Sequence, residues 1–228
     1  MNERIARITH KMWNFEVRVL YDDTIALPPY PLSSQLIAKN LRVQEGEDVL
    51  DLGTGCGIQA IVAKKLGASE VLATDVTNEI LDYARANFRL NGVHCDTCVS
   101  DLFSDVPKHG FGVIVANPPM FASADPSNLG VYGGPDGRTI LDRIIREAPS
   151  FLILGGRLII PTESYLGFGI TEHNLTCAGF RFQRIAWGIS PCSLHMLENL
   201  NFCAIKGQLH EIDGIRYFSS RVYEATRK

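Results

Sequence analysis

Short apolar runs alternate with longer amphipathic stretches through the middle of the chain. Five of the runs are typical of buried strands, at 48–52, 70–75, 97–100, 111–117 and 156–161. Helical periodicity predicts helices at 58–67, 78–90 and 136–149, and a further one around 164–178. Strands that alternate with helices in this way indicate βαβ units and a parallel sheet.

The segment before this alternation is less regular. It has a charged start, a β-like stretch at Phe15–Leu20 and a proline-rich turn at 27–31. Ser33 or Ser34 is expected to cap a helix that runs through Ala38, because a serine hydroxyl can accept hydrogen bonds from first-turn amides.

The pattern changes again after residue 180. Stretches at 181–190 and 214–228 predict two strands that bracket a helix at 193–200. We therefore predict an α/β fold with a doubly wound, mostly parallel sheet and an antiparallel C-terminal strand. With no repeat and no long linker, one domain over 1–228 is expected, divided into a lead at 1–47, a core at 48–161 and a C-terminal region at 162–228.

Composition narrows the class of protein. The 228 residues are 46% hydrophobic and 21% charged, which excludes disordered and fibrous classes. A net charge of −3 provides no broad basic field for nucleic acid, although a local patch would suffice for RNA. Six cysteines are too few for a disulfide scaffold, and no secretory signal or run of ~18 apolar residues is found. A reduced, cytoplasmic protein without a membrane segment is expected.

A glycine-rich turn joins the strand at 48–52 to the following helix. Gly53, Gly55 and Gly57 permit positive φ and let a ligand approach the backbone, and the helix N-terminus behind them favours an anionic group. The dinucleotide fingerprint would require a third glycine at position 58, which is Ile58. The turn therefore predicts another kind of ligand.

Acidic residues mark the ends of three consecutive strands. Asp51 lies where its carboxylate meets either an ammonium group or the amides of the loop. Asp75 is placed to accept hydrogen bonds from both hydroxyls of a ribose. Asp101, followed by Leu102, lies where an adenine edge would arrive. Together with the loop, these acids predict a site for an adenosine that carries an amino acid.

These ordered motifs resemble the class I S-adenosylmethionine-dependent methyltransferase family over roughly residues 48–161. The resemblance implies a Rossmann-like fold, S-adenosyl-L-methionine as cofactor and S-adenosyl-L-homocysteine as product. It implies that the methionine part is held by Asp51, Gly53, Thr54, Gly55 and Gly57. It also implies that Asp75 holds the ribose, that Asp101 and Leu102 hold the adenine, and that Val76 is a further cofactor-binding residue.

The fourth strand ends in Asn117-Pro118-Pro119-Met120, at the edge where open α/β sheets bind ligands. Two prolines give a rigid turn and remove two backbone donors. A target NH₂ group could donate to the Asn117 side-chain oxygen and the Pro118 carbonyl, which would aim the nitrogen at an electrophilic methyl group.

This tetrapeptide resembles the Asn-Pro-Pro-aromatic motif of the HemK-like amino-methyltransferases, and 133–145 resembles the segment that follows that motif. The resemblance implies catalytic roles for Asn117 and Pro118, with Asn117 also at the cofactor. It implies a substrate-binding role for Pro119, Met120 and Tyr30. Met120 departs from the usual aromatic residue, so a flat stacking face would have to come from Phe121.

The cysteines in this part of the sequence are not expected to form a metal-binding or catalytic site. Cys95-x-x-Cys98 beside His94 lacks the second pair that zinc sites of this kind need, so no metal is expected. Cys56 satisfies the need for a small side chain in the glycine loop, and no base is identifiable beside it.

The sequence alone does not identify the molecule that accepts the methyl group. A protein glutamine or similar amide ranks first, a small amine or natural product second and an RNA base third. A cyclase or lyase that consumes the cofactor, and a non-catalytic binding subunit, are the rival functions. Homodimerisation and a small activator subunit both stay open as partners.

Overall fold

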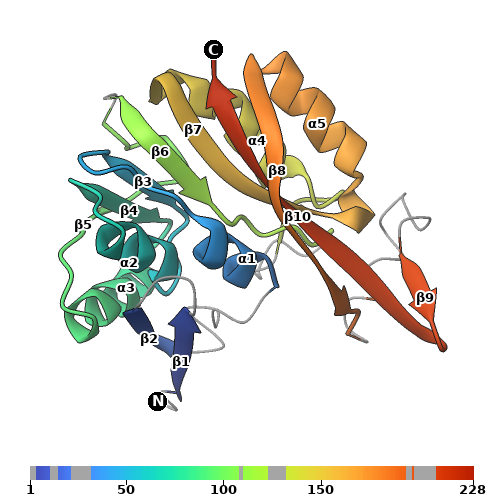
Figure 1. Cartoon of the computed structure of the whole chain (residues 1–228), viewed down its shortest axis with the longest axis horizontal. Coiled ribbons are helices and arrows are strands. Elements are labelled where there is room, and N and C mark those ends of the chain that lie inside the picture. Colours follow the sequence, from blue (N-terminus) through green and yellow to red (C-terminus); the bar gives the residue numbers. More distant parts are fainter. Residues whose placement is uncertain are drawn as a thin grey trace.

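The computed structural model describes residues 4–10, 15–21, 32–107, 110–122, 132–193, 197 and 209–228, with side chains from residue 15 onward. Their strands form a central eight-stranded sheet and a separate two-stranded hairpin. The central sheet has the order β5-β4-β3-β6-β7-β10-β8, and β9 pairs with β10 (Figure 1).

The first five strands of this order are parallel, as predicted. This half of the sheet is built from β3 (Val49–Leu52), α2 (Ile58–Lys65), β4 (Val71–Asp75), α3 (Asn78–Leu90), β5 (Asp96–Val99), β6 (Phe111–Ala116) and β7 (Leu152–Glu163). Every residue of β3 and β6 is buried, which agrees with their continuous apolar runs.

Two predicted helices are shorter than expected because glycines interrupt them. The helix expected at 136–149 is α4 (Thr139–Glu147), followed by the 3-10 turn η1 (Ala148–Ser150), since Gly137 at φ 76° forms a turn before it. The helix expected around 164–178 is divided into the 3-10 turn η2 (Ser164–Leu166) and α5 (Phe168–Cys177) by Gly167 at φ 78°.

The C-terminal strands are antiparallel, as predicted, and two of them, β8 and β10, are longer than the parallel strands β3 to β6. β8 (Phe180–Pro191) and β9 (His210–Ile212) both pair with β10 (Ile215–Arg227), which also pairs with β7. β10 therefore lies between two strands that precede it in the chain, and its first half extends beyond the parallel strands (Figure 1). Of the helix expected at 193–200, only residues 193 and 197 are described.

The N-terminal segment forms a hairpin of β1 (Arg4–His10) and β2 (Phe15–Tyr21), of which only β2 was predicted. The buried Asn87 of α3 holds β2 in place. Its amide nitrogen donates to the Leu20 carbonyl at 2.8 Å, and its amide oxygen accepts from the Leu20 N–H at 2.6 Å. The same amide nitrogen donates to the carbonyl of Cys56 in the glycine loop at 2.8 Å, so one side chain joins the hairpin to the loop.

Helix α1 (Leu32–Asn40) starts before both serines that were predicted to cap it. Ser33 and Ser34 lie inside its first turn and are buried, so the predicted capping role is wrong. The Ser34 hydroxyl instead accepts a hydrogen bond from the side-chain nitrogen of Asn117.

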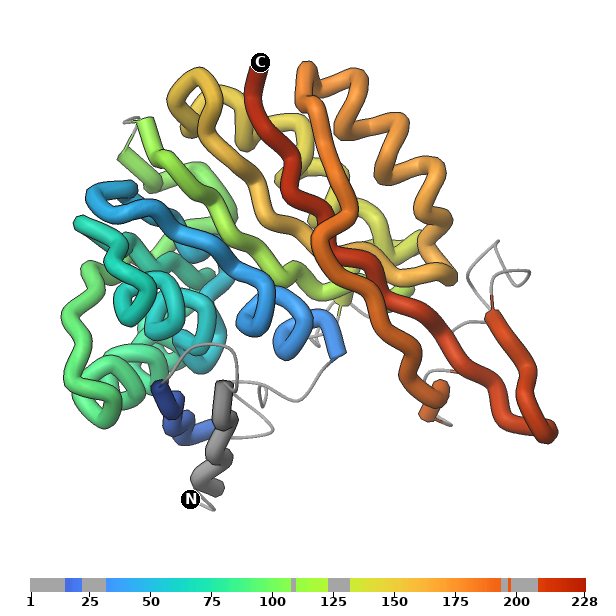
Figure 2. Tube along the Cα trace, viewed as in Figure 1, coloured from blue at the N-terminus to red at the C-terminus, as the bar shows by residue number. Residues whose placement is uncertain are grey.

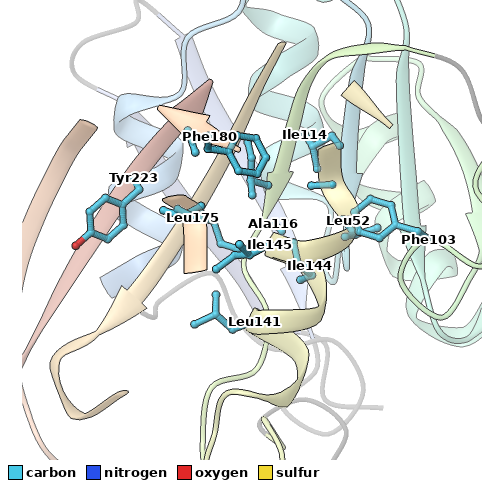
Figure 3. Close-up of a cluster of buried hydrophobic side chains, with 14 of the residues drawn as sticks. Leu52, Phe103, Ile114, Ala116, Leu141, Ile144, Ile145, Leu175, Phe180 and Tyr223 are labelled. Atoms are coloured by element: carbon cyan, nitrogen blue, oxygen red, sulfur yellow. The ribbon is translucent and has the colours of Figure 1, made fainter. Parts of the chain in front are cut away.

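Two hydrophobic clusters fill the two faces of the sheet, and the tube in Figure 2 shows helices on both sides. The first lies under α4 and α5 and includes Leu141, Ile144 and Leu175 (Figure 3). The second lies under α1, α2 and α3 and includes Ile37 and Ile61. Burial of each such side chain contributes ~1.5–3 kcal/mol, so the two-sided packing fixes the sheet that carries the site.

Candidate functional site

Four loops converge at the edge of the sheet where β3, β4, β5 and β6 have their carboxyl ends, which is where ligands bind in open α/β sheets. All the predicted site residues that are described lie on these loops or on the strand ends next to them. Tyr30 lies outside the described residues, so its role at the substrate stays a prediction.

The glycine loop after β3 has the backbone that its glycines permit. Gly53, Gly55 and Gly57 have φ of 71°, 54° and 85°. A Cβ atom at Gly53 or Gly55 would find no atom within 4 Å, whereas one at Gly57 would lie 2.7 Å from the ring of Phe88. The first two glycines thus border open space that a ligand can enter, and the third allows α2 to approach α3 closely.

Asp51 of β3 is 1% exposed and is hydrogen-bonded to this loop. One of its oxygens accepts hydrogen bonds from the Thr54 hydroxyl at 2.6 Å and from the Ala60 N–H of α2 at 2.9 Å. Burial raises the pKa of Asp51 to about 7; these two hydrogen bonds lower it and the charge of Asp75 raises it further. The glycine loop thus contacts Asp51 through the Thr54 hydroxyl rather than through a loop amide, and the amide that Asp51 accepts from belongs to α2.

Asp75 at the end of β4 is tied to the same loop. Its carboxylate accepts from the Gly55 N–H and from the Val76 N–H, both at 2.8 Å. Burial raises the pKa of Asp75, and the two amide hydrogen bonds oppose that rise. Val76 beside it is 42% exposed, as expected of a residue that a ligand could cover.

The loop after β5 carries the third acid. Asp101 is exposed and pairs with Arg143 of α4, whose guanidinium lies 2.8 Å from one carboxylate oxygen and 3.0 Å from the other. Leu102 has φ 51°, a left-handed backbone that is uncommon outside glycine. The buried Ser100 hydroxyl holds this turn by donating to the Leu102 carbonyl at 2.7 Å.

Asn117 has one satisfied and one unsatisfied end. Its amide nitrogen donates to the Ser34 hydroxyl of α1 at 2.7 Å. Its side-chain oxygen is buried and has no hydrogen-bond partner among the described residues. A buried acceptor without a partner costs roughly 1–3 kcal/mol, so the site retains capacity for a donor from a ligand.

Ser34 also connects Asn117 to the cofactor side of the site. Its carbonyl accepts from the side-chain nitrogen of Gln59, in the first turn of α2, at 3.1 Å. Neither Ser34 nor Gln59 was predicted as a site residue. The only sequence signal was the serine pair near the start of a helix, and that pair was interpreted as a cap.

The prolines after Asn117 are held by close backbone packing. A Cβ atom at Gly133 would lie 2.9 Å from the Pro119 carbonyl oxygen and 2.9 Å from the Cα of Met120. One at Gly137 would lie 2.5 Å from the Met120 carbonyl oxygen. The two glycines therefore allow the segment after the tetrapeptide to lie directly against it, and Pro118 is buried in this arrangement.

Met120 and Phe121, which follow the two prolines, differ in burial and in their contacts. Met120 is 6% exposed and belongs to the core cluster under α4 and α5. Phe121 is half-buried, and its ring centroid lies 6.1 Å from that of Tyr165, which in turn lies 5.8 Å from Phe218. An aromatic group thus stands beside the turn, while a substrate contact by Met120 or Pro119 stays a prediction.

A buried arginine, which was not predicted, holds the loops at this edge together. Arg138 is 5% exposed and pairs with Asp142 at 2.6 Å. It also donates to the Leu166 carbonyl at 2.8 Å and to the Thr171 hydroxyl at 3.2 Å. Arg138 thus links the segment that follows Asn117-Pro118-Pro119-Met120 to η2 and α5. Asp142 is its ion-pair partner.

Cys56 and Cys95 are buried thiols rather than reactive groups. Burial raises the pKa of Cys56 and that of Cys95 to about 12, which disfavours the thiolate. Within the described ranges, no three of the metal-binding residue types gather closely enough to hold a metal ion. In the same part of the chain, no helix is both long and apolar enough to cross a membrane.

Comparison with known proteins identifies the family. The family description "Methyltransferase small domain" matches residues 32–170. The chain belongs to this family. It is an S-adenosylmethionine-dependent methyltransferase with a Rossmann-like fold, as the resemblance implied.

Two relatives agree with the HemK-like resemblance. A protein of Methanocaldococcus jannaschii with the provisional name protein N5-glutamine methyltransferase is 35% identical over 156 residues, which are 66% of this chain and 79% of that one. The release factor glutamine methyltransferase of Deinococcus radiodurans is 34% identical over 158 residues, which are 63% of this chain and 56% of that one. The methyltransferase therefore spans little more than half of the second relative.

Solved structures show the same fold. The Thermus thermophilus 16S rRNA N2 G1207 methyltransferase, in complex with AdoMet and guanosine, has a TM-score of 0.61 at 17% identity, over 99% of this chain and 51% of that one. The Encephalitozoon cuniculi Mtq2–Trm112 complex has a TM-score of 0.55 at 19% identity, over 81% of this chain and 87% of that one. At these identities the likeness concerns the fold alone.

The residues at the carboxyl edge fit S-adenosylmethionine. Gly53 and Gly55 leave open space for a ligand, and Asp75 presents a partly exposed carboxylate beside that space. The buried Asn117 oxygen, which lacks a partner among the described residues, would gain one from a bound molecule. The cofactor supplies an electrophilic methyl group on a sulfonium, and the chain supplies the positions around it.

Proposed function

We propose that this methyltransferase transfers a methyl group to the side-chain amide nitrogen of glutamine in a protein, a release factor being the first candidate. The observation that carries the proposal is the Asn117 side-chain oxygen, which is buried and has no partner in the described ranges, while the amide nitrogen is fixed by Ser34. The oxygen is therefore free to accept from a target NH₂ group. The relatives named for glutamine methylation, and the Mtq2 structure described with methylation of the eRF1 termination factor, support this acceptor.

The proposed site has a cofactor side and an acceptor side. The cofactor is held by Asp51, Gly53, Thr54, Gly55, Gly57, Asp75, Val76, Asp101, Leu102 and Asn117. The acceptor nitrogen is oriented by Asn117 and the Pro118 carbonyl, with Pro119, Met120 and Tyr30 around the substrate. Two acceptor oxygens on one NH₂ group would aim its lone pair at the methyl group and stabilise the positive charge that develops on nitrogen.

Within this proposal the core at 48–161 serves the cofactor, and the lead at 1–47 and the region at 162–228 serve the acceptor. A cytoplasmic location and association with a small activator subunit or a second copy of the chain belong to the same proposal. The complex of Mtq2 with Trm112 supports an activator.

The test is methyl transfer from radiolabelled S-adenosylmethionine to a purified release factor, followed by mass spectrometry of its peptides. We expect a gain of one methyl group on a glutamine. Ribosomal protein L11, the substrate named for other relatives, and a release factor with that glutamine replaced by glutamate are the controls. Labelling of L11 alone, or of no protein, would contradict the proposed acceptor, and release of methylthioadenosine without any acceptor would indicate a cyclase or lyase instead.

A further inference from the structure

A second functional group, Glu163, lies at the end of β7, next to the strand that carries Asn117. β6 and β7 are parallel, with Val115 opposite Ile159. Asn117 follows Val115 by two residues and Glu163 follows Ile159 by four, so both side chains lie on the face that α1 covers. Two further residues of strand place Glu163 about 7 Å beyond Asn117 toward the carboxyl edge, on the acceptor side.

The first turn of α1 covers the row of residues that contains Glu163. Glu163 is opposite Ser220 of β10, and Ser220 is opposite Gly188 of β8. A Cβ atom at Gly188 would lie 3.0 Å from the Leu32 side chain, which shows that α1 begins directly above this row. Ser34, the partner of Asn117, is in the same turn. Asn117 and Glu163 therefore lie under the same helical turn.

Glu163 has little support of a purely structural kind. It is 4% exposed, and among the described residues its one hydrogen bond comes from the Ser220 hydroxyl to one carboxylate oxygen. A buried structural carboxylate is ordinarily paired with a cation or accepts several hydrogen bonds. Within the described part of the chain, the other carboxylate oxygen of Glu163 has neither, which is the arrangement expected of a group that awaits a ligand.

Few charges face Glu163 from the surrounding elements. On this face, β7 and β10 carry Arg157 and Glu224, which pair with each other at one end of the strands, and Arg216, which pairs with Glu211 toward the other end. β8 places Arg181 opposite Thr226, at the end away from Glu163. α1 has no acidic residue in its first turn and has Lys39 in its last turn, and β6 presents the neutral Asn117. Burial raises the pKa of Glu163 to about 8, and the hydrogen bond from Ser220 opposes that rise. Its carboxylate is thus an unusually strong base for a glutamate.

We propose that Glu163 is a catalytic residue that takes the proton released by the acceptor nitrogen during methyl transfer. This inference rests on the proposed function. The new bond joins the amide nitrogen to the methyl carbon, and the bond that breaks is the one between that carbon and the sulfonium sulfur. A methylated amide nitrogen that still carries both hydrogens is strongly acidic, so one proton leaves for the free carboxylate oxygen of Glu163. The products are the neutral methylamide, neutral S-adenosylhomocysteine and protonated Glu163.

The experiment compares Glu163→Gln with the wild-type enzyme, with the release factor as acceptor. Glutamine keeps the size of the side chain and an oxygen for Ser220 but cannot take a proton. We expect kcat to fall about 100-fold, the range of general-base catalysis, with KM and the affinity for S-adenosylhomocysteine within about twofold of wild type. The wild-type kcat should rise with pH toward a plateau above about 8, and this rise should be absent in Glu163→Gln.

Two further variants separate catalysis from folding. Glu163→Asp should recover part of the rate and of the pH dependence. Ser220→Ala removes the hydroxyl that lowers the pKa of Glu163, so the midpoint of the pH profile should move upward. A readout without turnover is thermal unfolding: Glu163→Gln should gain stability over wild type at pH 9 and show no such gain at pH 5.

The outcomes distinguish this inference from the proposed function. A wild-type enzyme that methylates no glutamine of the release factor contradicts the proposed function. An active wild type with an equally active Glu163→Gln, or with an unchanged pH profile in that variant, contradicts the role of Glu163 alone. If Glu163→Gln does not fold, Glu163→Asp and Ser220→Ala decide, and wild-type kinetics in both would overturn the inference.

Discussion

The two halves of the site differ in how their polar groups are satisfied. On the cofactor side, the carboxylates of Asp51 and Asp75 accept hydrogen bonds from the chain itself, and those bonds hold the glycine loop in shape. On the acceptor side, the Asn117 oxygen has no partner among the described residues, and Glu163 has one. The cofactor side is thus organised before a ligand arrives, whereas the acceptor side keeps oxygen atoms that can still accept hydrogen bonds from a ligand.

This difference corresponds to the two tasks of a methyltransferase. A common cofactor is bound by a rigid loop whose geometry depends on local glycines and strand-end acids. Transfer to an acceptor depends on groups that stabilise charge only when that acceptor is present. Substitutions on the two sides should therefore change different constants, and the following predictions test that separation.

The largest effect is expected from Asn117→Ala. Loss of the amide removes the acceptor oxygen that orients the target nitrogen, and we expect kcat to fall by about 10²–10³-fold. Affinity for S-adenosylhomocysteine, measured by calorimetry, should change much less. Ser34→Ala, which removes only the partner of the Asn117 nitrogen, should cost about 10-fold in kcat and serves as the matched variant. Equal turnover in Asn117→Ala would remove this residue from the mechanism.

Asp75→Ala should produce the opposite pattern. The alanine variant lacks the proposed ribose contact and the acceptor of two amide hydrogen bonds at 2.8 Å. Hydrogen bonds to a charged group contribute ~1.5–3 kcal/mol each, so cofactor affinity should weaken about 100-fold. Calorimetry gives the affinity, and kcat at saturating cofactor should stay within about fivefold. A large loss of kcat with unchanged cofactor affinity would contradict the prediction that the cofactor side determines affinity and the acceptor side determines kcat.

Two glycine substitutions separate the shape of the loop from the space beside it. Gly57→Ala introduces a Cβ 2.7 Å from the Phe88 ring at a positive φ and should lower the free energy of unfolding by ~2–4 kcal/mol. Gly53→Ala meets no atom within 4 Å, so its stability cost should be only ~1 kcal/mol while cofactor affinity falls. Urea unfolding and calorimetry measure the two quantities. Similar stability for both variants would contradict the close packing at Gly57.

The buried acid Asp51 predicts a pH dependence of stability. Its pKa is about 7 in the folded protein against 3.8 in its ordinary state, so its contribution is complete below pH 4 and is lost as the pH rises through 7. Asp51→Asn keeps an oxygen for Thr54 and Ala60 and should reduce the loss of stability between pH 5 and pH 9 by on the order of 2 kcal/mol. Urea unfolding at the two pH values measures it. An identical slope in the variant would show that Asp51 does not titrate there.

The smallest effect is expected from Arg143→Ala. Its ion pair with Asp101 is largely exposed to solvent, so the unfolding free energy should change by no more than ~0.5 kcal/mol. Solvent screens the attraction between the two charges, because neither side chain is fully buried. Cofactor affinity should rise or fall by less than threefold if Asp101 acts on adenine without help from Arg143. A tenfold loss would make Arg143 a positioning residue of the cofactor side.

Much of the cofactor side could be predicted because its determinants are local in sequence. Buried parallel strands are continuous apolar runs, and the loop and its acids follow them at fixed distances. The acceptor side depends on contacts between distant residues: Asn117 binds Ser34 across 83 positions, and Glu163 binds Ser220 across 57. No periodicity encodes such pairs, so Ser34, Arg138 and Glu163 were missed.

The strand β1 and the helix boundaries were missed for related reasons. β1 depends on its pairing with β2, and β2 in turn is fastened by the side chain of Asn87 rather than by a neighbouring strand. Gly137 and Gly167 end or divide predicted helices because each adopts a positive φ that a helix does not permit. Apolar periodicity shows which face of a helix is buried, but it does not show at which residue the helix begins or ends.

The position of β10 has a consequence for how the chain acquires its fold. β10 is synthesised after β7 and β8, yet it inserts between them. The parallel strands can pair as they emerge from the ribosome, but β7 keeps an open edge until β10 has been released. Ser220 arrives with that last strand, so the acceptor side is completed after the cofactor side. Synthesis of the chain thus yields a cofactor-binding half before it yields an enzyme.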